Sequence, residues 1–242
     1  MLNHNPHQFA KDGYCMYRHV FDPTEVESNQ LLVAEAIERD QLDNPNYYSE
    51  PHESDERWLE ICRHPRLLDA VQSVLGPHLI LIFSSLFLKP PGRVETVPWH
   101  QDNSYWPSIQ GTDVATAWLA IDDTDRDNAA MRVIPGSHTG FRESATLPSE
   151  SHEILSKKVN VKPEMEACTV SLEMEAGSVS IHDSFLIHSS ESNLSNRRRA
   201  GYTIRYCSSE TVKVDAEKHP NAVYLVRGET GQHKGRYIDL RP

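Results

Sequence analysis

The chain has 242 residues, of which 38% are hydrophobic and 24% charged, a balance typical of a folded globular protein rather than a disordered one. Its 35 acidic residues outnumber its 24 lysines and arginines and give a formal net charge of −11. That charge argues against a nucleic acid or an anionic membrane as partner, because both recruit basic surfaces. Four scattered cysteines without a CxxC pair, no signal-peptide pattern and no run of about 20 apolar residues favour a cytoplasmic protein with reduced thiols.

The first third of the sequence predicts helices. One helix is expected to begin at Asp22-Pro23, a capping residue before a proline, and another is expected from Pro65 until Gly76-Pro77 ends it. Apolar residues at helical spacing, which would face a core, follow each start: Val26, Val33 and Ile37 in the first helix, and Leu68, Val71 and Leu75 in the second.

From His78 onward the apolar period changes from about 3.6 to 2, which indicates strands. Long strands are expected over residues 79–88 and 114–121. Shorter strand-like segments follow, separated by turn signals: MRVIP (131–135), SVSIH (178–182), FLIH (185–188), AGYTIRY (200–206) and AVYLV (222–226). Helices followed by many short strands predict an α+β fold with a mainly β core, and no linker divides residues 1–242, so we expect a single domain.

The stretch from Thr139 to Glu175 is polar, charged and poorly periodic. It is a candidate lid over a binding site. A solvated surface insertion fits the same pattern equally well.

The first motif with chemical meaning is formed by His100 and Asp102, two residues apart in the segment PWHQDNSYWP. In an extended segment, residues i and i+2 point to the same side, so imidazole and carboxylate can converge on one ion. The spacing also fits a turn in which Asp102 accepts hydrogen bonds from backbone amides. Asn103, Tyr105 and Trp106 follow closely and are candidate substrate contacts, although core packing is the better expectation for the two aromatic rings.

His188, at the end of the strand-like segment FLIH, is the candidate for a third ligand. Two histidines and one carboxylate leave three positions open on an octahedral ion, the arrangement of non-heme Fe(II) oxygenases. His182 is a rival for this role, because it lies only six residues earlier. Its neighbour Asp183 is typical of a turn.

Arg199 is the candidate for binding a carboxylate. A dicarboxylate that chelates a metal through one end leaves a second carboxylate, which a planar guanidinium can hold with two hydrogen bonds. Strand alternation would place Arg199 on a small or polar face with Gly201, Thr203 and Arg205, which favours it over Arg198. Residues 197 and 198 are expected to belong to a solvated basic cluster.

Three blocks of the sequence, in this order, resemble the phytanoyl-CoA dioxygenase family: the segment around His100 and Asp102, AWLAIDDTDRDNAAMRVIPGSH, and residues 188–199. The similarity runs from about Phe9 to Gly228. It implies a double-stranded β-helix (a cupin-like jelly roll) with N-terminal helices packed on it. It also implies Fe(II), the co-substrate 2-oxoglutarate and O2, with ascorbate as a candidate stimulant.

The resemblance also implies roles for seven residues: His100, Asp102 and His188 would hold the iron, Arg199 with Ser190 would bind the distal carboxylate of 2-oxoglutarate, and Trp118 and Ser85 would line the co-substrate pocket. One departure is Ala129-Ala130, where the family usually has a glycine, so the turn before residues 131–135 is expected to differ.

The activity that the resemblance implies is hydroxylation of an unactivated C–H bond of a small-molecule metabolite, with release of succinate and CO2. Two alternatives stay open: a zinc-dependent hydrolase on the same three ligands, and a non-catalytic jelly-roll binding module. The substrate does not carry over from the family. Since the acidic chain has only scattered basic residues for the phosphates of an acyl-CoA, a small polar metabolite or a natural-product intermediate is favoured.

Overall fold

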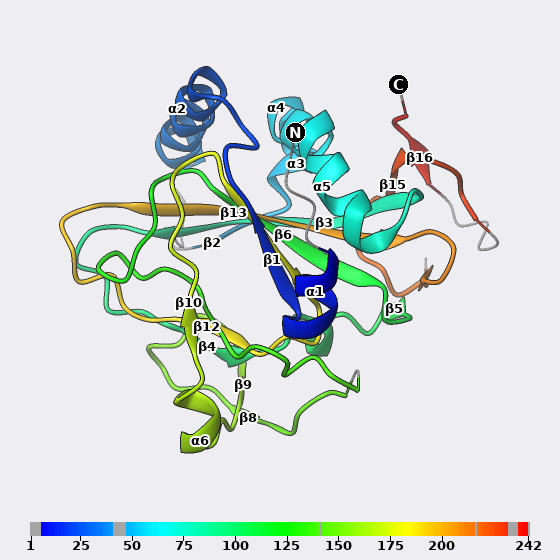
Figure 1. Ribbon diagram of the computed structural model, residues 1–242. Coiled ribbons are helices and arrows are strands. Elements are labelled where there is room, and N and C mark those ends of the chain that lie inside the picture. The colour runs from blue at the N-terminus through cyan, green and yellow to red at the C-terminus, as the bar shows by residue number, and fades with distance from the viewer. Residues whose placement is uncertain (1–5, 41–46, 141, 216, 232–236, 242) are drawn as a thin grey trace.

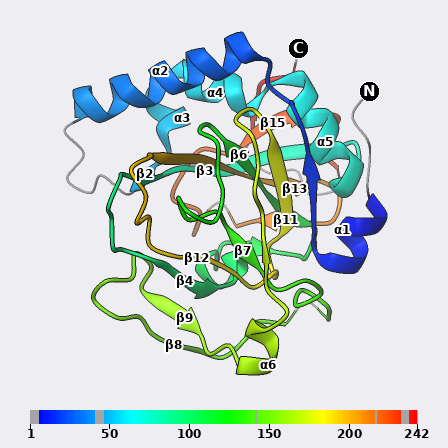
Figure 2. The ribbon, with the colours of Figure 1, turned by 60° about the vertical axis from the view of Figure 1, so that its left-hand side comes forward.

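A computed structural model of the chain describes residues 6–40, 47–140, 142–215, 217–231 and 237–241. Two β-sheets lie face to face, and helices cover the outer face of the larger sheet (Figures 1 and 2). This arrangement is the jelly roll with N-terminal helices packed on it that the family resemblance implies.

The larger sheet has eight strands in the order β1-β11-β6-β13-β3-β15-β16, with β2 also paired to β3. Its pairs are antiparallel except for β15 with β16. The strands span Tyr14–Tyr17 (β1), Tyr47–Ser49 (β2), Leu79–Lys89 (β3), Val114–Ala120 (β6), Val179–Asp183 (β11), Arg199–Ser208 (β13), Tyr224–Arg227 (β15) and Ile238–Asp239 (β16).

The smaller sheet has the order β10-β7-β12-β4, and two short strand pairs lie outside both sheets. The sheet's strands span Val97–His100 (β4), Arg132–Val133 (β7), Val170–Ser171 (β10) and His188–Ser190 (β12). The separate pairs join Ile109–Gln110 (β5) to Lys213–Val214 (β14), and Thr146–Pro148 (β8) to Lys157–Val159 (β9).

The main core lies between the larger sheet and the helices on its outer face. Alternate residues of β6 and β13, such as Leu119 and Ile204, point outward and pack against buried helix residues that include Val33, Trp58 and Val71. The helices span Pro6–Asp12 (α1), Pro23–Asp40 (α2), Pro51–Ser54 (α3), Glu56–Cys62 (α4), Pro65–Leu75 (α5) and Pro163–Glu166 (α6), and a 3-10 turn spans Asp102–Tyr105 (η1). None of the described helices is long and apolar enough to cross a bilayer.

Helix α2 begins where its capping signal predicts. The Asp22 carboxylate accepts the backbone amides two and three residues later, both at 3.0 Å, and the Glu25 carboxylate accepts the Asp22 amide at 2.7 Å. This reciprocal arrangement is a capping box. Val33 is buried as expected, but the expectation for Ile37 is wrong: it is 37% exposed, because the buried stripe passes through Ala36 instead.

His188 begins a strand rather than ending one, which corrects the expected strand over residues 185–188. Those residues form a buried turn, because the Asp183 carboxylate accepts the Phe185 amide at 2.8 Å and the Leu186 amide donates to the Asp183 carbonyl at 3.0 Å. The turn chemistry expected at Asp183 is confirmed. The apolar side chains of the turn are buried, so its sequence has the hydrophobicity of a strand.

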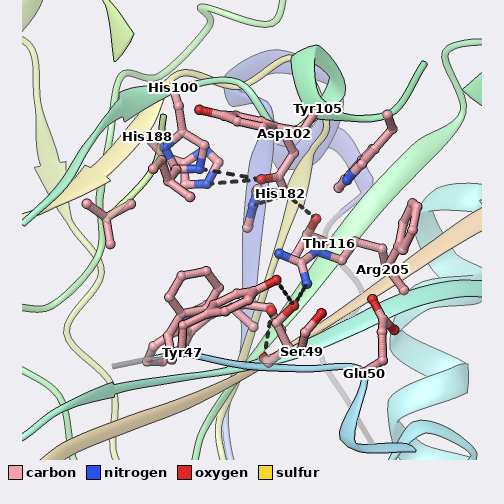
Figure 3. Close-up of a pocket in the computed structure, with 18 of the residues that line it drawn as sticks. Tyr47, Ser49, Glu50, His100, Asp102, Tyr105, Thr116, His182, His188 and Arg205 are labelled. Carbon is pink, nitrogen blue, oxygen red and sulfur yellow. Dashed lines mark hydrogen bonds and ion pairs between the residues drawn. The ribbon is translucent and has the colours of Figure 1, made fainter. Parts of the chain in front are cut away.

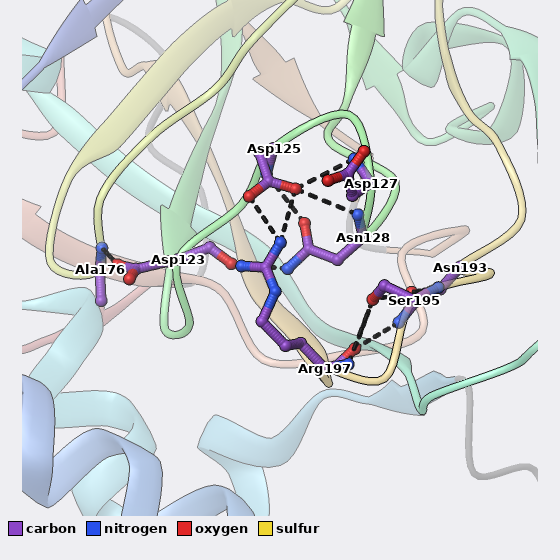
Figure 4. A network of polar contacts seen from close by, with 8 residues as sticks. All are labelled: Asp123, Asp125, Asp127, Asn128, Ala176, Asn193, Ser195 and Arg197. Atoms are coloured by element: carbon purple, nitrogen blue, oxygen red, sulfur yellow. Dashed lines mark hydrogen bonds and ion pairs between the residues drawn. The ribbon is translucent and has the colours of Figure 1, made fainter.

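The arginines before β13 lie at the surface, as expected of a solvated basic cluster, and both are also ion-paired. Arg197 donates to both carboxylate oxygens of Asp125, at 2.6 and 2.8 Å (Figure 4). Arg198 donates two hydrogen bonds of 2.8 Å to Asp122. These pairs hold the two side chains outside the sheets at the start of β13, while the next residue, Arg199, points inward and is buried.

Candidate active site

A cavity of about 460 Å³ lies between the two sheets, within the size range of small-molecule sites. His100, His188 and Asp102 gather on one side of it, and Arg205 points toward them from the larger sheet (Figure 3). Tyr47 lies on the opposite wall. The cavity therefore has a cluster of metal-binding groups at one side and polar groups facing it.

The three predicted ligands come together because of strand pairing. His188 at the start of β12 lies opposite His100 at the end of β4, and Asp102 begins the 3-10 turn that follows β4. One ligand atom from each residue lies within 4.8 Å of the others, and all three residues are buried. The His100 and His188 Nε2 atoms are 3.5 and 3.7 Å from Asp102 Oδ1.

Outer contacts fix the orientation of each ligand. Nδ1 of His100 lies 2.9 Å from the Pro98 carbonyl, and Nδ1 of His188 lies 2.9 Å from the Leu186 carbonyl. Because a carbonyl only accepts, each Nδ1 carries the proton and each Nε2 lone pair points to the centre. Thr116 donates to Asp102 Oδ2 at 2.6 Å, which leaves Oδ1 facing the two imidazoles.

Asp102 and His188 have the protonation states that a metal ion requires. Burial acts to raise the pKa of Asp102, but contacts with His100 and His182 and the charges of His188 and Arg205 outweigh it and hold its pKa well below the ordinary value. Burial, with the neighbouring histidines, holds the pKa of His188 well below its ordinary value. Near neutral pH the cluster therefore offers an ionised carboxylate and a neutral imidazole.

His182, the rival considered for the third ligand, lies beside the cluster and is not part of the convergent group. It projects from β11, its Nε2 is 3.6 Å from Asp102 Oδ2, and its ring centroid is 4.5 Å from that of His188. It therefore approaches the oxygen that Thr116 already bonds, on the outer side of the carboxylate.

Arg199 is buried at 2% exposure and lines the cavity from the first residue of β13. Its Nη2 donates to Ser190 Oγ at 3.1 Å, its Nε has no protein partner, and its guanidinium carbon lies 5.5 Å from the Trp118 ring centroid. Burial lowers the pKa of Arg199 to about 10, so the guanidinium stays charged at neutral pH. The structure thus brings Arg199, Ser190 and Trp118 together, as the resemblance implies.

Gly201 allows the Trp118 ring to pack directly against strand β13. A Cβ atom at position 201 would lie 2.0 Å from Cζ2 of the Trp118 ring, a distance that real atoms do not reach. The strand therefore needs glycine at this position for close approach of an aromatic ring, not for unusual backbone angles.

Ser85 lines the same cavity, but its partners lie away from Arg199. Its Oγ accepts a hydrogen bond of 2.9 Å from Arg205 and lies 3.1 Å from the Tyr47 hydroxyl. Strand alternation places Arg205 on the polar face of β13 with Arg199. This pattern could have identified Arg205 as a residue that lines the cavity. Tyr47 and Glu50, which also line the cavity, follow no motif that would have revealed them.

The three candidate substrate contacts have different positions. Tyr105 and Trp106 line the cavity, and Trp106 also packs in a buried cluster. The Asn103 side chain lies outside the lining, because its amide donates to Glu143 at 3.0 Å.

One residue of the segment from 139 to 175, Leu155, lines the cavity. The Tyr105 hydroxyl donates to the Lys157 carbonyl at 2.9 Å. Gln101 donates from its side chain to the Arg142 carbonyl at 3.1 Å. These contacts tie the segment to the residues around His100 and Asp102, while most of its described side chains are exposed, so both expectations for it stay open.

A buried centre of two histidines and one carboxylate, which leaves coordination positions open on an ion, is the donor set of the non-heme Fe(II) oxygenases. The chain belongs to the phytanoyl-CoA dioxygenase (PhyH) family, whose model matches residues 9–201.

Several known proteins are similar to it. The peroxisomal phytanoyl-CoA dioxygenase of Bos taurus is 26% identical over 169 residues, which cover 68% of this chain and 50% of that protein. The chain thus spans about half the length of that relative. The L-proline trans-4-hydroxylase of Streptomyces griseoviridis is 26% identical over 228 residues, covering 82% of this chain and 84% of that protein. The apo structure of the non-heme monooxygenase ThoJ has a TM-score of 0.80 and 25% identity, covering 97% of this chain and 86% of that one.

Proposed function

We propose that this protein hydroxylates an unactivated C–H bond of a small-molecule metabolite, using Fe(II), 2-oxoglutarate and O2 and releasing succinate and CO2. One observation carries the proposal: the same cavity holds three convergent ligand atoms and, on the facing sheet, a buried and charged Arg199. A hydrolase that uses the same ligands has no use for that guanidinium.

His100, Asp102 and His188 would hold the iron. Their donor set fits this ion, because two neutral imidazoles and one carboxylate are the ligands of non-heme Fe(II) oxygenases. The fixed Nδ1 contacts and the Thr116 hydrogen bond orient the donors before any ion arrives. Bound iron, together with 2-oxoglutarate and O2, supplies the oxidising power of the reaction.

The protein's own side chains bind, orient and exclude water. Arg199 would hold the distal carboxylate of 2-oxoglutarate, with Ser190 fixing the guanidinium and Trp118 covering it. Met131 and Leu155 add apolar surface to the cavity, which limits the water near the centre. The substrate would bind in the remaining space. A C–H bond that is positioned next to the metal reacts faster than one in a molecule that is free in solution.

Oxygen consumption and succinate release test the class of reaction. The purified protein is supplied with Fe(II), ascorbate and 2-oxoglutarate and is screened against small metabolites, including L-proline, the amino acid named in one relative. We expect 2-oxoglutarate-dependent oxygen uptake and a product 16 mass units heavier, formed in step with succinate. Turnover supported equally by Zn²⁺ without oxygen uptake would contradict the proposal.

Replacing Arg199 tests the co-substrate site. We expect Arg199→Ala to raise the dissociation constant for 2-oxoglutarate by roughly two to three orders of magnitude, because an unpaired buried charge costs about 3–5 kcal/mol and each 1.4 kcal/mol is tenfold. Titration calorimetry with Mn²⁺ in place of Fe(II) measures this constant. The control is Arg126→Ala, whose side chain is 77% exposed and should leave it unchanged. A constant near the wild-type value in Arg199→Ala would overturn the assignment.

A further inference from the structure

Arg205 is a second buried arginine in the cavity, and the proposed reaction leaves it without a role. It is 8% exposed, lines the cavity and lies near the ligand cluster, since its charge lowers the pKa of Asp102. Its strand neighbour in β6 is Thr116, the residue that bonds Asp102. Arg205 therefore stands close to the place where the reacting bond must lie.

The guanidinium of Arg205 has few partners for a buried charge. Among the described residues it donates one hydrogen bond, to Ser85 Oγ at 2.9 Å, and its Nε has no protein partner. Its guanidinium carbon also lies 5.9 Å from the Trp106 ring centroid. Asp102 and Glu50 act on this guanidinium through their charge, but among the described residues it forms no direct ion pair. It therefore keeps a donor, Nε, for a carboxylate in the cavity.

The co-substrate does not supply that anion. Arg199 and Arg205 lie on the same face of β13, six residues apart, so their Cα atoms are separated by roughly 20 Å at the rise of a strand. The carboxylate that pairs with Arg199 would therefore lie away from Arg205, and the other end of the diacid would be taken up by the metal. The anion must come from a second molecule in the cavity.

We propose that Arg205 binds a carboxylate group of the substrate and so determines which C–H bond faces the metal. This inference rests on the proposed function and names its substrate class: a small carboxylic acid. Ser85 would hold the guanidinium in place, because its Oγ already accepts a hydrogen bond from Arg205. The Tyr47 hydroxyl in turn contacts Ser85 Oγ. The Trp106 ring lies beside Arg205, with its centroid 5.9 Å from the guanidinium carbon.

The charges nearby favour a carboxylate over a phosphate. The Glu50 carboxyl group lines the same part of the cavity, and the charge of Arg205 acts on it. Lys218 also lines the cavity, but its side chain is 63% exposed and pairs with Asp215 at 3.2 Å. One guanidinium beside a carboxyl group matches a single negative charge, whereas a dianionic phosphate would meet repulsion.

The test compares acids with their uncharged counterparts. L-Proline, pipecolate, 4-aminobutyrate and hexanoate, each with its primary amide, and phosphoethanolamine as the phosphate probe, are added to the full chain loaded with Mn²⁺ and 2-oxoglutarate. Ligand-observed NMR detects binding at millimolar concentration, and succinate release with Fe(II) follows turnover. We expect one or more acids to bind and their amides to bind at least tenfold more weakly.

The variant Arg205→Gln should weaken the binding of the preferred acid by roughly two orders of magnitude, and its amide by less than threefold. Its dissociation constants for Mn²⁺ and 2-oxoglutarate should stay within about threefold of wild type, whereas Arg205→Lys should recover part of the acid binding. Arg126→Gln is the control for loss of one positive charge.

Three results would overturn the inference: amides or phosphoethanolamine binding as well as the acids, no acid binding at all, or Arg205→Gln weakening Mn²⁺ or 2-oxoglutarate as much as the acid. Failure of the proposed function looks different, because the wild type itself would then bind no 2-oxoglutarate and release no succinate.

Discussion

Asp183 carries a buried carboxyl group, and burial raises its pKa to about 7. The folded protein therefore holds this proton at pH values where the unfolded chain, with an ordinary pKa near 3.8, has released it. Since the native state binds more protons between these two values, stability falls as the pH rises from about 4 to about 7.

Asp183→Asn removes this penalty and can keep the turn, because the amide oxygen still accepts the Phe185 hydrogen bond. We expect the variant to be more stable than wild type at pH 8, by at most about 4 kcal/mol, and the difference to vanish near pH 4. Urea unfolding at both pH values measures it. Glu50, whose pKa burial raises to about 7, titrates in both proteins and cancels from the comparison. A difference independent of pH would show that the carboxyl group is not the cause.

Gly201→Ala tests whether the Trp118 ring needs a glycine in β13 in order to pack against the strand. The added methyl group would overlap the indole ring, so we expect a loss of about 1–3 kcal/mol in unfolding free energy, typical of overpacking. Affinity for 2-oxoglutarate should fall as well, because the displaced ring lines the cavity beside Arg199.

The double variant Trp118→Phe/Gly201→Ala is the matched test, since phenylalanine lacks the ring atoms that the methyl group would meet. We expect it to be more stable than Gly201→Ala alone, measured by denaturant unfolding of all four proteins in a double-mutant cycle. Simple additivity of the two losses would mean that the methyl group is accommodated elsewhere.

The ligand triad rested on the family resemblance, because the spacing of His100 and Asp102 also fits a turn and His182 was a rival to His188. The partners of these residues gave no such signal. The Thr116 hydroxyl, which sets the carboxylate, belongs to an ordinary strand pattern and gives no local signal. Likewise Ser85 was placed in the cavity, but its bond to Arg205 depends on how β3 and β13 align.

At the level of elements, the capping box of α2 gives a clear prediction. Asp22→Ala removes two hydrogen bonds to backbone amides and should lower the unfolding free energy by about 1 kcal/mol, or the melting temperature by about 2–4 °C. Scanning calorimetry checks this. Asp22→Ser keeps a capping oxygen and should lose much less; an equal loss in both would assign the effect to charge rather than capping.

Long elements were predictable because their period persists over many residues. The strands over 79–88 and 114–121 and the helix from Pro65 emerged close to their observed bounds. The strand expected over 185–188 failed, because a turn whose apolar side chains are buried has the same hydrophobicity as a strand. Short elements such as α3 and α4 carry too few turns to show a period, and their packing on the sheet decides them.

At the level of the whole molecule, the metal centre should stabilise the fold. Its ligands exist in this geometry only when β4, η1 and β12 are assembled, so an ion binds the folded state alone. At 100 times the dissociation constant a ligand adds about 2.7 kcal/mol, which raises the melting temperature by roughly 5–10 °C. Calorimetry with EDTA, with Mn²⁺, and with Mn²⁺ plus 2-oxoglutarate should show successive increases. The same increases in His100→Ala/His188→Ala would locate the ion elsewhere.

The order of the periods, helices first and then strands, predicted an α+β fold with a mainly β core, whereas the two-sheet jelly roll was implied by the family resemblance. Which faces meet could not be predicted in the same way, since both faces of β6 are buried and its sequence does not distinguish them. The organisation of residues 1–242 as one domain, and a cytoplasmic location, stay predictions.

Strand β13 would fix the distance between the carboxylate of the co-substrate and the carboxylate of the substrate. Arg199 and Arg205 lie on one strand that is hydrogen-bonded to β3 on one side and to β6 on the other. The backbone distance between the two arginines therefore cannot change when only a side chain is replaced. One residue inserted between them would turn one guanidinium into the helix-facing core. Recognition of longer or shorter substrates would then require changes in the surrounding loops, because the distance between the two arginines stays constant.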